Sequence, residues 1–278
     1  MLNAVPDIFT SRVGRRAALA VRLQRHRRRR LSSDVLATLA DIANCVALFE
    51  PDPATMGFTG ASDMTSWAPA FGSSAYTANY FAGVGPRPQF DPYAFGYRKP
   101  GVFFRGSSLE ARALSMTWTN ATFVLVGRMD LANLTSAYPR WLGLEHFANG
   151  WQDWNTAQTI SPFDYDVAGH NVADSYASLG SFALPVSATL PNLMVCRKVG
   201  AVITGWVKPA GGGIVTASSD VGVGSQALNA DRLSLGGSQW LGAGTMLFGW
   251  IGMAGVWGRG LSDAEVNSVF NYLTRIYG

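Results

Sequence analysis

The sequence predicts a mainly β fold with a basic helical arm at its N-terminus and one capping helix at its C-terminus. Three observations support this fold class. Short runs of β-branched and aromatic residues are separated by glycines, 31 of them in 278 residues, which is typical of short strands joined by tight turns. The last segment has the apolar spacing of a single helix. Residues 1–33 contain nine arginines and one acidic residue, Asp7.

Charge divides the chain into an arm and a body. The whole chain has 22 basic and 18 acidic residues, and its net charge is +4. Outside residues 1–33, 13 basic residues stand against 17 acidic ones, so the body is mildly acidic and the basic charge belongs to the arm. Hydrophobic residues make up 48% of the chain, which is enough for a large core. No run has the length of a membrane-spanning helix, so no membrane partner is expected.

The arm, residues 1–44, is predicted to hold a partner through its arginines. The residues expected to make these contacts are Arg15, Arg16, Arg22, Arg25, Arg27, Arg28, Arg29 and Arg30. They could pair with carboxylates of a partner protein, or bind nucleic acid through its phosphates without reading its sequence. The arm has no aromatic residues interleaved for base stacking, and docking on a protein is the favoured alternative.

The strands expected in the body follow one another from residue 45 onward. The predicted strand runs are 46–50, 101–106, 121–130, 193–198, 201–208, 231–237 and 245–257. The fourth and fifth are separated by Val199 and Gly200, which favours a hairpin. Residues 57–100 show little periodicity and are predicted to form a long ordered loop region, because they contain too many aromatics for a solvated linker.

The last helix has clear local signals. Ser262 stands three residues before Glu265, so the two side chains can cap the first turn reciprocally. The apolar stripe that follows consists of Val266, Val269, Phe270, Leu273 and Ile276. A second helix is expected to begin at Ser33 or Asp34. The C-terminal helix is amphipathic and needs a surface to cover.

The order of these features resembles the concanavalin A-like lectin/glucanase jelly rolls, in particular laminin G-like domains. The C-terminal residues that match the pattern are Arg259, Leu261, Ser262, Asp263, Ala264, Glu265, Tyr277 and Gly278, and the upstream ones are Arg87, Pro88, Phe104, Gly106 and Ser107. Residues 47–56 are similar to the opening strand of a version common in bacteriophage structural proteins. The resemblance implies a jelly-roll sandwich over residues 45–278, with the helix closing one edge or end.

The sequence argues against hydrolysis. Glucanases of this superfamily carry paired glutamates spaced as Glu-x-Asp-x-x-Glu, because retaining hydrolysis needs two carboxylates that flank the bond. Here Glu145 is isolated, and Glu110 lies far upstream. The three histidines, His26, His146 and His170, have no nucleophile signature beside them.

A lectin-like site is expected instead. Aromatic faces can stack on sugar rings while polar neighbours orient the hydroxyls. The candidate carbohydrate-binding residues are Trp141, Trp151, Trp154, Gln152 and Asp153. The alternative is that some of these tryptophans fill the core, which is the expectation for Trp206, Trp250 and Trp257 inside strand patterns.

No cofactor is expected, with one alternative. Asp164, Asp166, Asn171 and Asp174 lie close together in sequence and supply the oxygen ligands that suit Ca²⁺. A solvated turn held by Asx hydrogen bonds is the favoured reading of the same residues. Of the two cysteines, Cys45 and Cys196, two free thiols are favoured over a disulfide.

These observations together predict a non-enzymatic structural protein of a bacteriophage virion, made in the host cytoplasm: a capsid decoration, fibre or tail accessory. Its arm would bind other virion proteins in a homo-oligomer or a larger assembly, and its outward domain would bind host glycans. Two alternatives remain open. One is a glycan-degrading enzyme of the same superfamily, and the other is a nucleic-acid-packaging protein that acts through the arm.

Overall fold

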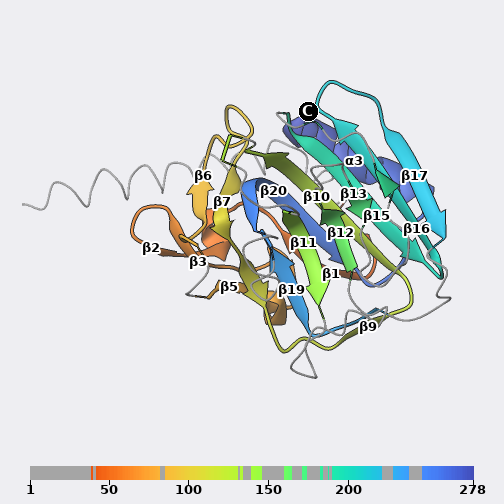
Figure 1. The fold of residues 1–278 in the computed structure, drawn as a ribbon, viewed down its shortest axis with the longest axis horizontal. Helices are drawn as coiled ribbons and strands as arrows, with labels where there is room; N and C mark the ends of the chain where they lie inside the picture. Colours follow the sequence, from red (N-terminus) through yellow and green to blue (C-terminus); the bar gives the residue numbers. More distant parts are fainter. Residues whose placement is uncertain are drawn as a thin grey trace, which may run out of the picture. The chain divides into compact units, whose positions relative to one another are not determined.

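The structure is a computed structural model (Figure 1). It describes residues 39, 42–81, 85–130, 132–133, 139–145, 160–164, 171–173, 182–183, 187, 190–220, 228–237 and 246–278. The chain divides into two units, Met1–Asp41 and Ile42–Gly278, and the second is described below. The described residues confirm a mainly β fold that ends in one helix.

Most of the described strands belong to one antiparallel sheet of sixteen strands, which has two parts. The first part, called here the first layer, contains in spatial order β12 (Ile160–Asp164), β11 (Arg140–Glu145), β19 (Arg232–Leu235), β8 (Leu109–Ala111), β5 (Ala78–Tyr80) and β3 (Asp63–Trp67), with β2 (Met56–Thr59) paired to β3. The second layer contains β6 (Gln89–Asp91), β7 (Gly101–Ser107), β20 (Leu247–Trp257), β10 (Ala121–Met129), β15 (Asn192–Val199), β16 (Val202–Pro209) and β17 (Val215–Asp220). Two strands lie off this path: β1 (Cys45–Phe49) pairs with β20, and β4 (Phe71–Gly72) pairs with β1.

Two further pairs of short strands lie outside this sheet. They are β13 (Asn171–Ala173) with β14 (Phe182–Ala183), and β9 (Met116–Trp118) with β18 (Leu228–Ala230). Within the large sheet, β3 and β6 join the two layers through the pair Asp63 and Gln89. The sheet then folds back, so that β11 contacts β10 and β20, as in a β-sandwich.

The core fills the space between the layers. Because side chains alternate along a strand, every second residue of each layer faces inward. The inward residues that are almost fully buried include Leu109, Ala111, Leu233 and Leu235 from the first layer and Phe123, Leu125, Ile251 and Val256 from the second. Gly236 ends β19 at a φ of +83°, and the ring of Phe104 lies where a β-carbon would stand. The intervening residues of the first layer therefore face away from the core.

The long strands agree with the sequence, and the region 57–100 does not. Strands cover each of the seven predicted runs, and β15 and β16 form the predicted hairpin. Residues 57–100, however, contain most of β2 and all of β3, β4, β5 and β6. The prediction of a long loop there is wrong. The sequence pattern did not reveal these strands because they have only two to five residues and a bulge follows Gly57, so no alternation of apolar and polar residues can be recognised.

The C-terminal helix α3 (Asp263–Tyr277) has the predicted cap but a different position. The Ser262 hydroxyl accepts a hydrogen bond from the backbone N–H of Glu265 at 3.3 Å. The Tyr277 hydroxyl donates to the carbonyl of Gly252, in the middle of β20, at 2.7 Å. Figure 1 shows α3 lying behind β10 and β15. The helix thus covers the outer face of the second layer, which corrects the expectation that it closes an edge or end.

Cys45 and Cys196 are free thiols, the first half-buried and the second buried. Burial raises the pKa of the Cys45 thiol to about 12 and raises that of Cys196 well above its usual range. In the part of the chain that the structure describes, no helix has the length and apolar character needed to cross a membrane.

Candidate active site

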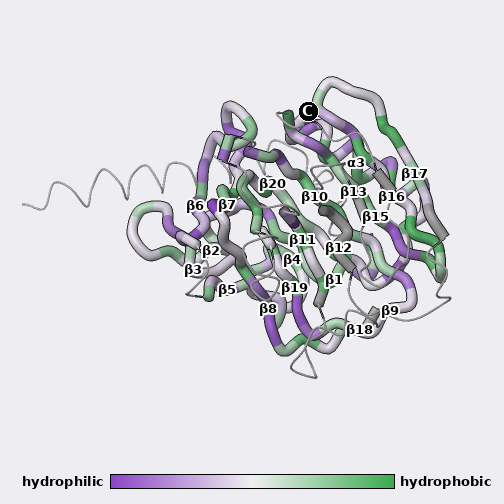
Figure 2. Tube along the Cα trace, viewed as in Figure 1, coloured by the Kyte–Doolittle hydropathy of each residue, from purple (hydrophilic) through white to green (hydrophobic). Residues whose placement is uncertain are grey.

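A row of small and polar residues crosses the outer face of the first layer. From β2 to β11 the residues that stand directly opposite one another are Gly57, Ser66, Asn79, Glu110, Ser234 and Gly143. Their neighbours along each strand, such as Leu109 and Leu233, point into the core. Figure 2 shows hydrophilic residues along β8 and β19, in the middle of this row. One carboxylate, that of Glu110, therefore stands at the centre of a polar sheet face.

Glu110 is held in place by Arg112, which follows the last residue of β8. The side chain of Glu110 is 0% exposed. Its Oε2 accepts a hydrogen bond from Nε of Arg112 at 2.9 Å, and Nη2 of the same guanidinium lies at 2.8 Å. That guanidinium also lies over the ring of Phe81, 3.4 Å from the ring centroid. The carboxylate is thus paired and fixed in orientation, as a buried charge must be.

A second arginine connects Glu110 to another carboxylate. Arg232, on the neighbouring strand β19, places Nη1 3.8 Å from Oε2 of Glu110. Its Nε lies 3.9 Å from Oδ1 of Asp231. Between them, on the same face, the buried Ser234 hydroxyl donates to the carbonyl of Gly143 at 3.4 Å. Two carboxylates, two guanidiniums and a hydroxyl therefore lie close together on the strands β8 and β19 and on the residues directly next to them.

The sheet register also places a second glutamate on this face. Glu145, the last residue of β11, stands directly opposite Arg232 of β19. Residues opposite one another in an antiparallel pair lie on the same face. Glu110 and Glu145 are therefore on the two strands that flank β19, although 35 positions separate them in sequence. The prediction that Glu145 is isolated concerned its position in the sequence, and the register places it two strands from Glu110.

The sequence contained a partial signal for these residues. The runs Leu109–Glu110–Ala111 and Arg232–Leu233–Ser234–Leu235 alternate, so each predicts a polar outer face. What the sequence lacks is the pairing of β8 with β19 and of β19 with β11, which brings the polar faces together.

The predicted carbohydrate-binding tryptophans are only partly described. Trp141 is 1% exposed and belongs to the core. Its indole lies against Gly127, where a β-carbon would stand 2.7 Å from Nε1. Trp141 therefore offers no free face to a sugar, which corrects its place in the predicted set. Trp151, Gln152, Asp153 and Trp154 lie outside the described residues.

Of the three tryptophans expected in the core, one lies there. Trp257 is fully buried. Trp250 and Trp206 are half-buried and lie outside the core cluster, each with a guanidinium over its ring: Arg128 at 4.0 Å for Trp250 and Arg197 at 4.8 Å for Trp206. The side chains of Trp206 and Trp250 therefore lie on the outer face of the second layer, away from the core.

The predicted calcium ligands lie at the margin of the described structure. Asp164 ends β12 and Asn171 begins β13, while Asp166 and Asp174 lie outside the described residues. No group of three or more metal-ligating side chains occurs in the described part of the chain. The eight predicted partner-binding arginines of the arm, Arg15 to Arg30, also lie outside it, and their role stays a prediction.

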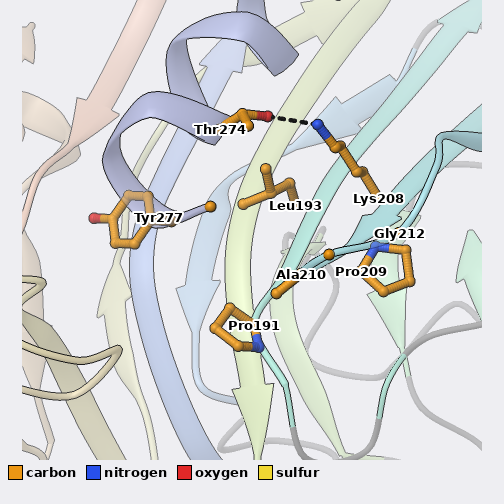
Figure 3. Close-up of a pocket in the computed structure, with 10 residues that line it drawn as sticks. Pro191, Leu193, Lys208, Pro209, Ala210, Gly212, Thr274 and Tyr277 are labelled. Carbon is orange, nitrogen blue, oxygen red and sulfur yellow. Dashed lines mark hydrogen bonds between the residues drawn. The ribbon is translucent and has the colours of Figure 1, made fainter.

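A pocket on the other layer differs in chemistry from the Glu110 face (Figure 3). It has a volume of about 310 Å³ and lies between the start of β15, the end of β16 and the last turn of α3. Leu193, Pro191 and Tyr277 form much of its wall, and Nζ of Lys208 donates to Oγ1 of Thr274 at 2.9 Å. The described residues that line it include no aspartate or glutamate, so the Glu110 face is the better candidate for acid–base chemistry.

Comparison with known proteins gives matches of fold. No protein family and no curated protein matches the sequence. Among solved structures, the Trypanosoma rangeli sialidase in complex with sialic acid matches with a TM-score of 0.51 and 14% identity, covering 84% of this chain and 34% of that chain. A mutant of a GH54 α-L-arabinofuranosidase soaked with 4-nitrophenyl α-L-arabinofuranoside matches with a TM-score of 0.53 and 10% identity, covering 77% and 51%. This chain thus spans about a third of the sialidase's length and about half of the arabinofuranosidase's.

These comparisons correct the predicted function. At such identities the likeness shows a shared fold, and the proteins that share it are glycosidases. The predictions of a non-enzymatic virion structural protein and of an absent enzymatic activity are therefore wrong, and the alternative of a glycan-degrading enzyme is favoured. The spacing argument considered only glutamates on one strand, and Glu110 and Glu145 lie on two different strands.

Proposed function

We propose that the protein is a glycan-degrading enzyme whose active site is the outer face of the first layer around Glu110. The observation that carries the proposal is the register that places Glu110 and Glu145 on strands flanking β19, on one face of the sheet. Hydrolysis of a glycosidic bond needs two carboxyl groups on either side of the bond. The glycosidases that share this fold support a glycoside as the substrate class.

The two glutamates would have different roles. Glu110 is fixed by Arg112 and has Arg232 beside it, which suits the carboxylate that stabilises positive charge developing on the sugar ring or attacks it. Glu145 would then donate a proton to the leaving oxygen and later accept one from water. Arg232 stands opposite Glu145 in the strand register, and its Nη1 lies 3.8 Å from Oε2 of Glu110. Its guanidinium would therefore orient the substrate between the two glutamates.

The finer fold assignment is part of the same proposal. A two-layered antiparallel sandwich with a capped C-terminal helix supports the concanavalin A-like jelly roll to which the sequence is similar. In such a sandwich, a polar outer sheet face can accept an extended glycan lying across the strands.

The test is hydrolysis of a panel of 4-nitrophenyl glycosides and oligosaccharides by the full-length protein. We expect Glu110→Gln and Glu145→Gln each to lower kcat by about 10² or more, because each change removes one acid–base or nucleophilic group. Glu50→Gln, the same change next to β1, serves as the matched control and should keep the wild-type rate. Full activity in Glu110→Gln, or no hydrolysis by the wild type across the panel, would contradict the proposal.

A further inference from the structure

The loop that joins β6 to β7 presents two tyrosines to solvent. Tyr93 and Tyr97 are 60% and 74% exposed. Their rings lie 15° from parallel, with centroids 6.3 Å apart. The guanidinium of Arg98 lies 4.9 Å from the centroid of the Tyr97 ring. These three residues are called here the tyrosine platform.

The platform stands on a well-ordered loop. Oδ1 of Asp91 accepts from the backbone N–H of Tyr93 at 2.8 Å, and the N–H of Gly96 donates to the carbonyl of Tyr93 at 2.9 Å. Phe95, between the two tyrosines, is 6% exposed and meets the ring of Tyr277 edge to face at 5.5 Å. Phe95 and these hydrogen bonds therefore hold the loop against the rest of the protein while its two tyrosines face outward. Because the loop is already fixed, ligand binding would cost little conformational entropy.

Arg98 occupies a backbone conformation that costs free energy. Its φ is +60°, the left-handed region that glycine adopts without strain and that other residues seldom adopt. Strain of this kind persists where the surrounding structure imposes it, often at sites of recognition. The strain here places an exposed guanidinium beside two exposed aromatic rings.

The charges around the platform favour an anionic ligand. The cation that lies beside the two tyrosines is Arg98, which follows Tyr97 directly. Nζ of Lys99 donates to the carbonyl of Gly278 at 2.8 Å, and the charge of Arg128 interacts with the carboxylates of Asp91 and Asp130. Oδ1 of Asp91, the last residue of β6, already accepts a backbone hydrogen bond. An aromatic face stacks on the C–H groups of a pyranose, and a guanidinium pairs with a carboxylate.

We propose that the tyrosine platform is a binding site for an acidic glycan, in which a pyranose ring packs on Tyr93 and Tyr97 and its carboxylate pairs with Arg98. The choice of a glycan rests on the proposed function, whereas the platform rests on the geometry of the loop alone. The tyrosine platform consists of other residues than the Glu110 face, and it would increase the affinity of the protein for an acidic polysaccharide.

The first experiment measures binding of trigalacturonate, a short uronic-acid oligosaccharide, to the full-length protein by calorimetry. A trisaccharide is used because the arginines of residues 1–33 would bind a long polyanion by themselves. The double variant Tyr93→Ala/Tyr97→Ala should bind roughly tenfold more weakly or not at all. Phe71→Ala removes another exposed aromatic ring, 44% exposed on β4, and should bind as the wild type does.

The second experiment separates recognition from folding at Arg98. Arg98→Gly relieves the left-handed strain, so the melting temperature should stay the same or rise while trigalacturonate binding weakens roughly tenfold. Ala113→Gly relieves the same kind of strain at a φ of +58° and should leave binding unchanged. A platform with a purely structural role would show no loss of binding in Arg98→Gly.

Three results would overturn the proposal: no binding of trigalacturonate to the wild type, wild-type binding in the double tyrosine variant, or equally tight binding of the neutral maltotriose. All titrations are repeated with Glu110→Gln, so that they read binding without turnover. Failure of hydrolysis with retained binding would refute the proposed enzyme and leave the platform standing, and the opposite result would refute the platform alone.

Discussion

Arg259 forms a bidentate ion pair with the carboxylate of Glu265 through both of its terminal nitrogens. Nη1 donates to Oε2 at 2.9 Å, Nη2 pairs with Oε1, and Nε donates to the carbonyl of Ala43 at 2.9 Å. The same glutamate accepts from the N–H of Ser262 at 2.8 Å. One guanidinium therefore fastens the first turn of α3 to the segment that precedes β1.

This pair makes stability depend on pH. The Arg259 hydrogen bond is the main cause that lowers the pKa of Glu265 to about 2, and the Ser262 hydrogen bonds lower it further. Because the folded-state pKa lies below the unfolded one, the stabilisation is complete above about pH 4.5 and is lost as the pH falls toward 2. Glu265→Gln should cost about 1–2 kcal/mol at pH 7 after screening of a partly exposed pair. Chemical unfolding at pH 7 and pH 3 should show that the difference from the wild type shrinks, and a constant difference would contradict this account.

Arg112 should be needed for stability because it pairs with a buried charge. Arg112→Ala leaves the carboxylate of Glu110, which is 0% exposed, without its nearest cation. Breaking a buried pair in this way costs about 3–5 kcal/mol. The double variant Arg112→Ala/Glu110→Gln should recover much of the loss, as measured by urea unfolding. No recovery in the double variant would show that Arg112 acts through packing on Phe81 instead.

Gly236 should tolerate no side chain. Its φ is +83°, and an added β-carbon would lie 2.1 Å from the ring of Phe104. Gly236→Ala combines backbone strain with overpacking and should cost about 3 kcal/mol or more. Gly213→Ala is the matched control, since nothing lies within 4 Å of its β-carbon position. Thermal unfolding of both variants should show a large loss for the first and almost none for the second.

The two thiols should be inert in the folded protein. Burial raises the pKa of the Cys45 thiol to about 12, and the Cys196 thiol is fully buried. Because only the thiolate reacts readily, both thiols should react slowly. At pH 8 a thiol-reactive aromatic disulfide should label neither residue within minutes and should label both in guanidinium chloride. Fast labelling of the native protein would contradict the burial of Cys45.

The sequence predicted the elements whose signals are local. The cap at Ser262, the hairpin of β15 and β16 and the apolar strand β10 depend on neighbours a few positions away. The strands between 57 and 100 were missed because β4 and β5 have only two and three residues, too few for an alternating pattern to be recognised.

The candidate site was harder to predict for a different reason. Glu110 and Glu145 lie on strands two apart in the sheet, and two sets of backbone pairs, β8 with β19 and β19 with β11, determine this arrangement. No local pattern encodes which strands become neighbours. The position of Trp141 in the core likewise depends on Gly127, which lies on the opposite layer and leaves room for the indole.

The place of β20 in the sheet has a consequence for how the chain folds. This strand pairs with β10, β7 and β1, and its pairing with β1 places Cys45 opposite Trp257. During synthesis, β1, β7 and β10 therefore emerge long before the strand that must lie between them. Pairing over such long stretches of chain is slow, and exposed strand edges invite association with other chains. We expect the second layer to assemble only after translation has passed residue 257, with a need for chaperone protection until then.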